Sequence, residues 1–178
     1  NNTTATDLSF GAGISSFGDV IVTNSLIDSN STAGANSVGG GLFVRSADLT
    51  ITDSTVSNNT TTGGASGGGI IVANGNLLVM GSTVSGNSAS GQAGGIGFDS
   101  NGNPVTATIV NSTVSGNTAT SFGGGISNVN GTLNIQHSTV TNNTAPAGSG
   151  SGVASYSDGA MLIGNTVVLS SIISDNTN

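Results

Sequence analysis

Few residues of this chain could carry out acid–base or nucleophilic chemistry. The single histidine, His137, directly precedes Ser138, and the single long cation, Arg45, is followed by Asp48 and Asp53. A nucleophilic serine needs a positioned base and an oxyanion hole, whereas adjacent residues of a strand point their side chains to opposite faces. We therefore expect no catalytic residue and no enzymatic activity.

A metal site finds only weak support. Asp99, Asn101 and Asn103 stand at alternate positions, in a spacing similar to that of a calcium loop. Pro104 occupies the place where such loops need Gly, and no bidentate Glu follows, because the chain contains no Glu. The expected cofactor is none, and these three residues are kept as weak candidates for calcium.

The charge of the chain restricts its partners. The net charge is −7, with eight acidic residues and one Lys or Arg. Phosphate binding needs clustered Lys and Arg, so nucleic acid is not an expected partner. No apolar run approaches the roughly 20 residues of a spanning helix, so membrane insertion is not expected either.

The elements that must position these residues form a repeat of about 28 residues. Six segments align without gaps, among them LTITDSTVSNNT from Leu49 and ATIVNSTVSGNT from Ala107. One column is always Ser: Ser25, Ser54, Ser82, Ser112, Ser138 and Ser171. Five residues later a column is always Asn, and Asn2 extends it: Asn2, Asn30, Asn59, Asn87, Asn117, Asn143 and Asn176. A Gly-rich block such as GGGI from Gly67 separates the copies.

Within each repeat, apolar and polar residues alternate over short runs, which is the period of a strand. The phase slips between Ile51 and Ser54 and again between Val56 and Asn59, so each run is expected to end at a corner. Short strands cannot bury their apolar faces alone, but stacked repeats pair every strand around a shared interior. The sequence predicts an all-β, right-handed parallel β-helix in one domain, residues 1–178, with about six coils and three short strands per coil.

The alternation of GGGI with L-x-I-x-x-S-T-V-S-x-N-x-A covers essentially the whole chain and resembles the right-handed β-helix repeats of bacterial surface proteins. The polymorphic outer-membrane proteins and pectate-lyase-like repeat proteins are the groups that it resembles. The resemblance implies an extracellular or cell-surface protein, and adhesion as a common role. It also makes a polysaccharide lyase or hydrolase the strongest enzymatic alternative. Such enzymes need a base with calcium-binding carboxylates or paired acids, and here Arg45, Asp48 and Asp53 form the one basic–acidic cluster.

The repeated polar columns are expected to face inward. A corner asparagine can donate to the equivalent amide one coil away and accept from the other side, so a stack of them satisfies itself as a ladder. The serine hydroxyls are expected to bond to the backbone of a neighbouring coil. The Gly columns fit positive φ or a tight backbone approach at a bend.

Surface-binding candidates come from two outward features. Thr55, Thr83, Thr113 and Thr139 are expected to stack in one file, as in ice-binding solenoids, although Thr is also an ordinary exposed strand residue. Two coils carry longer insertions, and insertions on one face of a solenoid are where binding usually resides. They contribute Asp99, Tyr156 and Asp158.

The function that we expect is a non-catalytic extracellular structural protein, either a filament subunit or an adhesin stalk. The chain ends at the repeat phase with which it begins, so it is expected to be a segment of a longer solenoid or a subunit that associates end to end. The alternatives are an ice-binding protein that uses the Thr and Ser face, and a carbohydrate-binding or carbohydrate-active β-helix with a glycan or cell-surface ligand.

Overall fold

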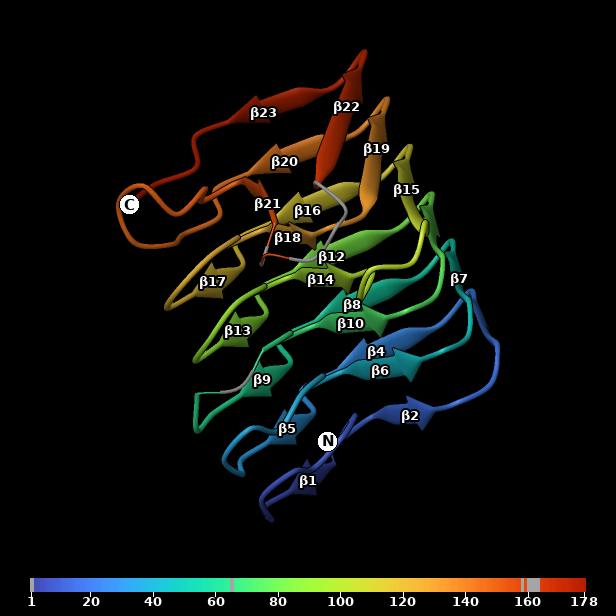
Figure 1. Ribbon diagram of the computed structural model, residues 1–178, viewed down its shortest axis with the longest axis vertical. Helices are drawn as coiled ribbons and strands as arrows, with labels where there is room; N and C mark the ends of the chain where they lie inside the picture. The colour runs from blue at the N-terminus through green and yellow to red at the C-terminus, as the bar shows by residue number, and fades with distance from the viewer. Residues whose placement is uncertain (1, 65, 158, 160–163) are drawn as a thin grey trace.

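A computed structural model describes residues 2–64, 66–157, 159 and 164–178. Every strand pairs in parallel with the equivalent strand of the next coil, so the chain winds into a parallel β-helix (Figure 1). Four sheets run along the stack, and the described residues contain no helix.

The short sheet is named after the length of its strands, and the other three sheets are named after the part of the repeat that forms them. The short sheet contains β1 (Thr3–Thr4), β5 (Ser31–Thr32), β9 (Thr60–Thr61), β13 (Ser88–Ala89) and β17 (Thr118–Ala119). The glycine sheet, which follows the Gly-rich block, contains β2 (Ile14–Ser16), β6 (Leu42–Arg45), β10 (Ile70–Ala73), β14 (Ile96–Asp99), β18 (Ile126–Val129) and β21 (Val153–Tyr156).

Two further sheets come from the L-x-I and S-T-V runs. The leucine sheet contains β3 (Val20–Thr23), β7 (Leu49–Thr52), β11 (Leu77–Met80), β15 (Thr106–Val110), β19 (Thr132–Gln136) and β22 (Asn165–Leu169). The threonine sheet contains β4 (Leu26–Asp28), β8 (Thr55–Ser57), β12 (Thr83–Ser85), β16 (Thr113–Ser115), β20 (Thr139–Thr141) and β23 (Ile172–Ser174).

The predicted β-helix is confirmed, with two corrections. A complete coil has four strands rather than three, because the two residues after each corner asparagine pair with their equivalents as the short sheet. About five turns are complete rather than six, because the short sheet has five strands while each of the other three sheets has six. After the last two corner asparagines, Asn143 and Asn176, the place of the short strand is taken by isolated bridges at Thr144 and Thr177.

The corners fall where the alternation changes phase. The residue between the leucine and threonine sheets adopts a left-handed backbone in every coil: Asn24, Asp53, Gly81, Asn111, His137 and Ser170. The residue before each corner asparagine from Asn30 onward does the same: Ser29, Asn58, Gly86, Gly116, Asn142 and Asp175. A single left-handed residue turns the chain and reverses the inward and outward alternation, which explains both slips in the sequence.

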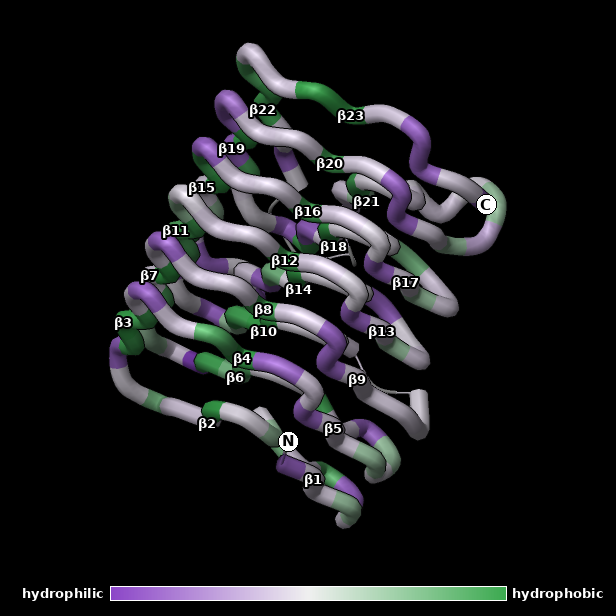
Figure 2. Tube along the Cα trace, turned by 180° about the vertical axis from the view of Figure 1, so that it is seen from behind, coloured by the Kyte–Doolittle hydropathy of each residue, from purple (hydrophilic) through white to green (hydrophobic). Residues whose placement is uncertain are grey.

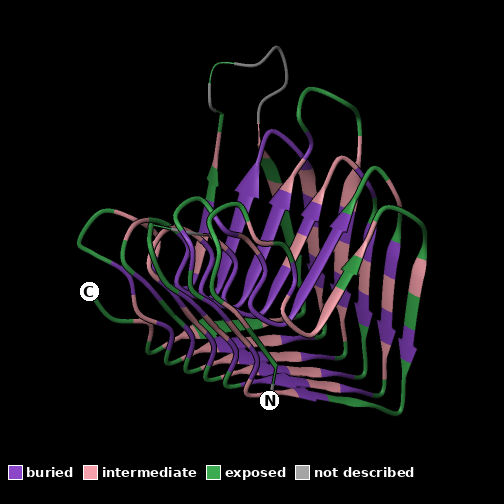
Figure 3. Cartoon of the chain, turned by 90° about the horizontal axis from the view of Figure 1, so that it is seen from below, coloured by how far each residue is buried: buried purple, intermediate pink, exposed green. Residues whose placement is uncertain are grey.

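Apolar side chains from three of the sheets form a continuous column in the interior. Leu42 and Val44 of the glycine sheet, Ile51 of the leucine sheet and Val56 of the threonine sheet are fully buried, as are their equivalents in the middle coils. Figure 3 looks along the stack, with buried residues concentrated on the superposed strands and exposed residues at the loops. In Figure 2 the threonine sheet is mostly pale, and the strongly hydrophilic residues lie at its corners.

Candidate functional site

The asparagine ladder forms as predicted and runs the length of the described stack. The Asn59 backbone N–H and side-chain amide both donate to the Asn87 side-chain oxygen, at 2.9 and 3.0 Å, and the amide also donates to the Ile27 carbonyl at 3.0 Å. Amide-to-amide bonds of the same kind join each neighbouring pair from Asn2 to Asn176. The ladder therefore satisfies its own buried amides and ties each coil to the next.

The glycine block is shaped by this ladder. A Cβ at Gly69, the third glycine of its block, would lie 2.6 Å from the Gly95 carbonyl oxygen and 3.0 Å from the Asn87 amide. The first glycine, Gly67, has a φ of 72°. Both expected reasons for the Gly columns, close approach and positive φ, are confirmed, at different positions of the block.

The serine column faces inward and is structural. The Ser82 hydroxyl accepts a hydrogen bond from the Ser54 N–H of the neighbouring coil at 3.1 Å and donates to the Met80 carbonyl of its own coil at 2.8 Å. The four inner serines, Ser54, Ser82, Ser112 and Ser138, are buried, whereas Ser25 is exposed and Ser171 half-buried in the end coils. His137 is exposed while Ser138 is buried, so these adjacent side chains do lie on opposite sides of the chain.

The threonine file also forms in register. Thr55, Thr83, Thr113 and Thr139 pair directly across the threonine sheet and are half-buried. A second file runs parallel to it two residues along: Ser57, Ser85, Ser115 and Thr141. From β8 to β20 the two files form a regular outer face without charged residues.

Asp28 lies at one end of the second file. Its carboxylate accepts hydrogen bonds from the Ser57 hydroxyl and the Ser29 hydroxyl, each at 2.7 Å, and from the Asn58 amide at 2.8 Å. These bonds favour the ionised form, so the pKa of Asp28 lies below its usual value of 3.8. The carboxylate is thereby fixed to two coils.

The basic–acidic cluster expected from the sequence does not form. Within the described residues Arg45 makes no ion pair with Asp48 or Asp53. The Asp48 carboxylate instead accepts hydrogen bonds from the Asn76 backbone at 2.8 Å and from its side-chain amide at 3.1 Å. Asp53 occupies a corner with left-handed backbone, and Arg45 ends β6 on the neighbouring sheet.

The insertion residues are only partly brought together. The Asp99 carboxylate accepts a hydrogen bond from the Asn101 N–H at 2.8 Å, and the Asn103 amide donates to the Asn74 side chain. Asp158 lies outside the described residues. Within the part of the chain that the structure describes, no three His, Cys, Asp or Glu side chains gather closely enough to hold a metal ion. The described part also has no helix long and apolar enough to span a membrane.

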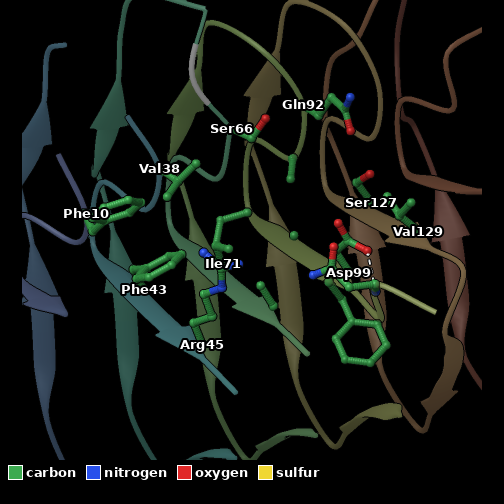
Figure 4. A pocket seen from close by; sticks show the side chains of 15 residues that line it. Phe10, Val38, Phe43, Arg45, Ser66, Ile71, Gln92, Asp99, Ser127 and Val129 are labelled. Atoms are coloured by element: carbon green, nitrogen blue, oxygen red, sulfur yellow. Dashed lines mark hydrogen bonds between the residues drawn. The ribbon is translucent and has the colours of Figure 1, made fainter. Parts of the chain in front are cut away.

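A groove that the sequence does not reveal runs along the outer face of the glycine sheet. Loops that lead from each short strand to the next glycine block form an arm beside this face (Figure 3). Val38, Ser66 and Gln92 line the groove from the arm, and Phe43 and Ile71 line it from the sheet. We call this space, with a volume of about 400 Å³, the groove. Figure 4 shows the side chains that converge on it.

Asp99 and Tyr156, which were expected at the insertion face, lie close to this groove. Asp99 lines it directly, and the Tyr156 hydroxyl donates a hydrogen bond to the Gln92 side-chain oxygen. The Tyr156 ring also lies against Phe122 of the arm, with ring centroids 5.3 Å apart. In the sequence, only their position next to the insertions marked Asp99 and Tyr156 as candidates. That position did not indicate that the arm would lie beside them.

Comparison with known proteins gives one match. A family model described as a right handed beta helix region matches residues 1–172. No curated protein and no solved structure matches the chain.

Proposed function

Because the chain belongs to the right-handed β-helix family, we propose that it is a non-catalytic structural segment of an extracellular rod, as a filament subunit or an adhesin stalk, that lengthens by coil stacking. The observation that carries this proposal is the register of the stack. The four sheets and the asparagine ladder repeat from coil to coil, and the two end coils leave matching edges unpaired.

The uncovered edge of the last coil is apolar. Val168 and Ile173 occupy the inward columns of Ile135 and Val140, which are fully buried one coil earlier. In the last coil, 46% of Val168 and 44% of Ile173 is exposed. Another coil laid on this edge would bury both residues and extend the ladder from Asn176, which supports lengthening of the rod by coil stacking.

Electron microscopy and sedimentation of the purified 178-residue chain at rising concentration test this proposal. Rods of uniform width and increasing length are expected. Ile173→Lys places a charge on the uncovered inward column and should abolish the lengthening, whereas Ile172→Lys, on the outward file beside it, should not. Short rods of constant length at every concentration would overturn the proposal.

A second candidate function, ice binding, is favoured by the two in-register files of the threonine sheet. Flat files of Thr and Ser at strand spacing offer a repeated pattern of methyl and hydroxyl groups on an uncharged surface. A thermal-hysteresis assay tests this candidate by comparing the native chain with the Thr83→Tyr, Thr113→Tyr double variant. Equal activity of the two proteins, or no hysteresis in the native chain, would reject it.

A further inference from the structure

Three asparagines of this chain are followed directly by glycine. The pairs are Asn74–Gly75, Asn101–Gly102 and Asn130–Gly131. Because glycine has no Cβ, its backbone nitrogen can approach the side-chain amide of the preceding asparagine without steric hindrance. Asparagine is a thermolabile residue, and spontaneous deamidation is fastest in this pair. The three pairs should react alike in an unfolded chain, so any difference between them in the folded protein comes from the structure.

Deamidation of such a pair proceeds through a cyclic imide. The glycine nitrogen loses its proton and forms a bond to Cγ of the asparagine, the Cγ–Nδ2 bond breaks, and Nδ2 leaves as ammonia. Water then opens the imide. Opening at Cγ gives aspartate, and opening at the main-chain carbonyl carbon gives isoaspartate, in which Cβ becomes part of the backbone. Water is the one further reactant, but the asparagine side chain and the glycine nitrogen must be free to approach each other.

The Asn130–Gly131 pair is held by the next coil. Asn130 is 2% exposed, and its backbone N–H donates to the Tyr156 carbonyl at 3.0 Å. The Gly131 carbonyl accepts hydrogen bonds from the Asn128 side-chain amide and from the Asn165 N–H, each at 2.9 Å. The rotation that the reaction needs therefore requires local opening of the stack.

The Asn74–Gly75 pair is also held, although Asn74 is only half-buried. The Asn74 N–H donates to the Asp99 carbonyl at 2.7 Å, and its side-chain oxygen accepts a hydrogen bond from the Asn103 amide. Gly75 is buried, and a Cβ on it would lie 1.9 Å from the Ala47 carbonyl oxygen. Contacts with the coils on both sides thus restrict the movement of this pair.

The Asn101–Gly102 pair lies exposed in the loop between β14 and β15. Among the described residues, the Asn101 side chain makes no hydrogen bond, and the place of a Cβ on Gly102 has no atom within 4 Å beyond its chain neighbours. The backbone N–H groups of the pair bond only within the loop, from Asn101 to the Asp99 carboxylate at 2.8 Å and from Gly102 to the Ser100 hydroxyl at 3.3 Å. These bonds tie the pair to its own loop and to no other coil.

We propose that Asn101 deamidates spontaneously in the folded protein, whereas Asn74 and Asn130 react only when the stack opens. The chain itself supplies both reacting groups, Cγ of Asn101 and the nitrogen of Gly102. The reaction needs no self-association and no ligand, so it is independent of the proposed function.

The product changes the groove. Asn101 lines it together with Arg45 and Asp99, which contribute one positive and one negative charge. Deamidation places a second carboxylate two residues from Asp99, so the groove becomes acidic. The net charge of the chain becomes one unit more negative than −7. The charge of the groove therefore depends on the age of the protein molecule.

Peptide mapping tests the proposal. The native chain and the same chain unfolded in guanidinium chloride are incubated in parallel at mildly alkaline pH and then digested with chymotrypsin. Phe98 and Phe122 lie between the three asparagines, so each asparagine falls in a separate peptide. Mass spectrometry reports the gain of about 1 Da on deamidation. An isoaspartate methyltransferase with a labelled methyl donor reports the isoaspartate product.

In the folded chain Asn101 should deamidate at least about tenfold faster than Asn74 or Asn130, because those two require local opening. In the unfolded chain the three rates should converge. Asn101→Gln keeps an uncharged amide in the loop and should prevent the acidic form from appearing on anion exchange. Asn134→Gln, on the outer face of β19, is the matched control and should give the acidic form at the parental rate. Gly102→Ala adds a Cβ beside the attacking nitrogen and should slow the reaction.

Two results would overturn the proposal: an Asn101 that stays intact in the folded chain, or a folded chain in which Asn74 or Asn130 reacts as fast as Asn101. Both results are read from the native sequence, so the decision does not depend on the folding of any variant.

Discussion

The threonine sheet and the glycine sheet have the same parallel ladder but very different outer faces. Along the middle of the threonine sheet the outward residue is Thr in four successive coils, whereas the glycine sheet presents Phe43, Ile71, Gly97 and Ser127 at equivalent positions. The inward residues of both sheets are similar and buried. The repeat thus determines the interior residues of every coil. The outward column of the glycine sheet, beside the arm, instead has a different residue in each coil.

This difference divides the residues into two groups. The first group recurs in every coil and holds neighbouring coils together, and the second occurs in single coils and lines one surface. The ladder, the serine column and the tight glycines belong to the first group, because each contacts the next coil. The rings of the groove and Ser127 belong to the second. Substitutions in the two groups should therefore differ in their effect on stability. Two predictions test this difference, and two further predictions concern a corner and the edge of the threonine sheet.

The largest effect is expected from Asn87→Ala. It removes the acceptor of the Asn59 backbone N–H and side-chain amide and the donor to the Val56 carbonyl, all in the interior. We expect a loss of about 4 kcal/mol in the free energy of unfolding, measured by urea denaturation. Asn134→Ala, at a half-buried outward position of β19, is the control and should change it by less than about 0.5 kcal/mol. Equal losses of stability in Asn87→Ala and Asn134→Ala would contradict the special role of the ladder.

The same Gly→Ala substitution should have different effects at two sites. At Gly69 the new Cβ meets the Gly95 carbonyl oxygen at 2.6 Å, a backbone atom held between coils, and the expected loss is about 3 kcal/mol. At Gly97, on the groove floor, it meets side-chain atoms, with the Ile71 Cδ1 at 2.2 Å and the Ala93 Cβ at 2.9 Å. Because the end of Ile71 can rotate, we expect a loss of about 1 kcal/mol there. A lower urea midpoint for Gly97→Ala than for Gly69→Ala would contradict this prediction and would show that the groove floor is at least as rigid as the ladder.

A corner leading into the threonine sheet can be stabilised. His137 has a φ of 48°, a left-handed conformation that costs a side chain about 1–2 kcal/mol relative to Gly. His137→Gly should raise the free energy of unfolding by about 1 kcal/mol, after allowance for the greater entropy of Gly in the unfolded chain. Gln136→Gly, one residue earlier in β19, should lower it instead. A loss at both positions would mean that His137 makes a stabilising contact.

The smallest effect is the response to acid at the edge of the threonine sheet. The folded-state pKa of Asp28 lies below 3.8, because Ser57, Ser29 and Asn58 donate to the carboxylate. Its contribution to stability is therefore fully present above pH 3.8 and is lost as the pH falls through the folded-state pKa. The thermal midpoint of the native chain should fall more than that of Asp28→Asn between about pH 5 and 2. Parallel curves for the two proteins would rule out this contribution.

The sequence predicted most of the fold, because the fold is made of repeated contacts. The constant Asn and Ser columns indicated the ladder and the inward hydroxyls, and the phase slips located the corners. The short sheet was missed because its strands have two residues, which is too short for any alternation to show. Its best indication was the Asn–Thr or Asn–Ser pair that recurs where each strand begins.

The groove could not be predicted for a different reason. Its residues occupy positions where the repeat varies, and they come from separate coils, so they meet only when the register is known. Phe10 and Phe43, for example, are more than one repeat apart in sequence and come into contact through the arm. The polar residues of the insertions drew attention to Asp99 and Tyr156, but nothing in the sequence indicated that Ser127 would be buried without a partner.

The ladder has a mechanical consequence. Its hydrogen bonds join coil to coil and so lie along the axis of the stack, as do the backbone bonds of all four sheets. Tension applied to the two ends along this axis loads the outermost coil first, and each coil can peel away while the rest stays folded. The rod would then yield in steps of one coil, each releasing about 28 residues, or about 95 Å of extended chain.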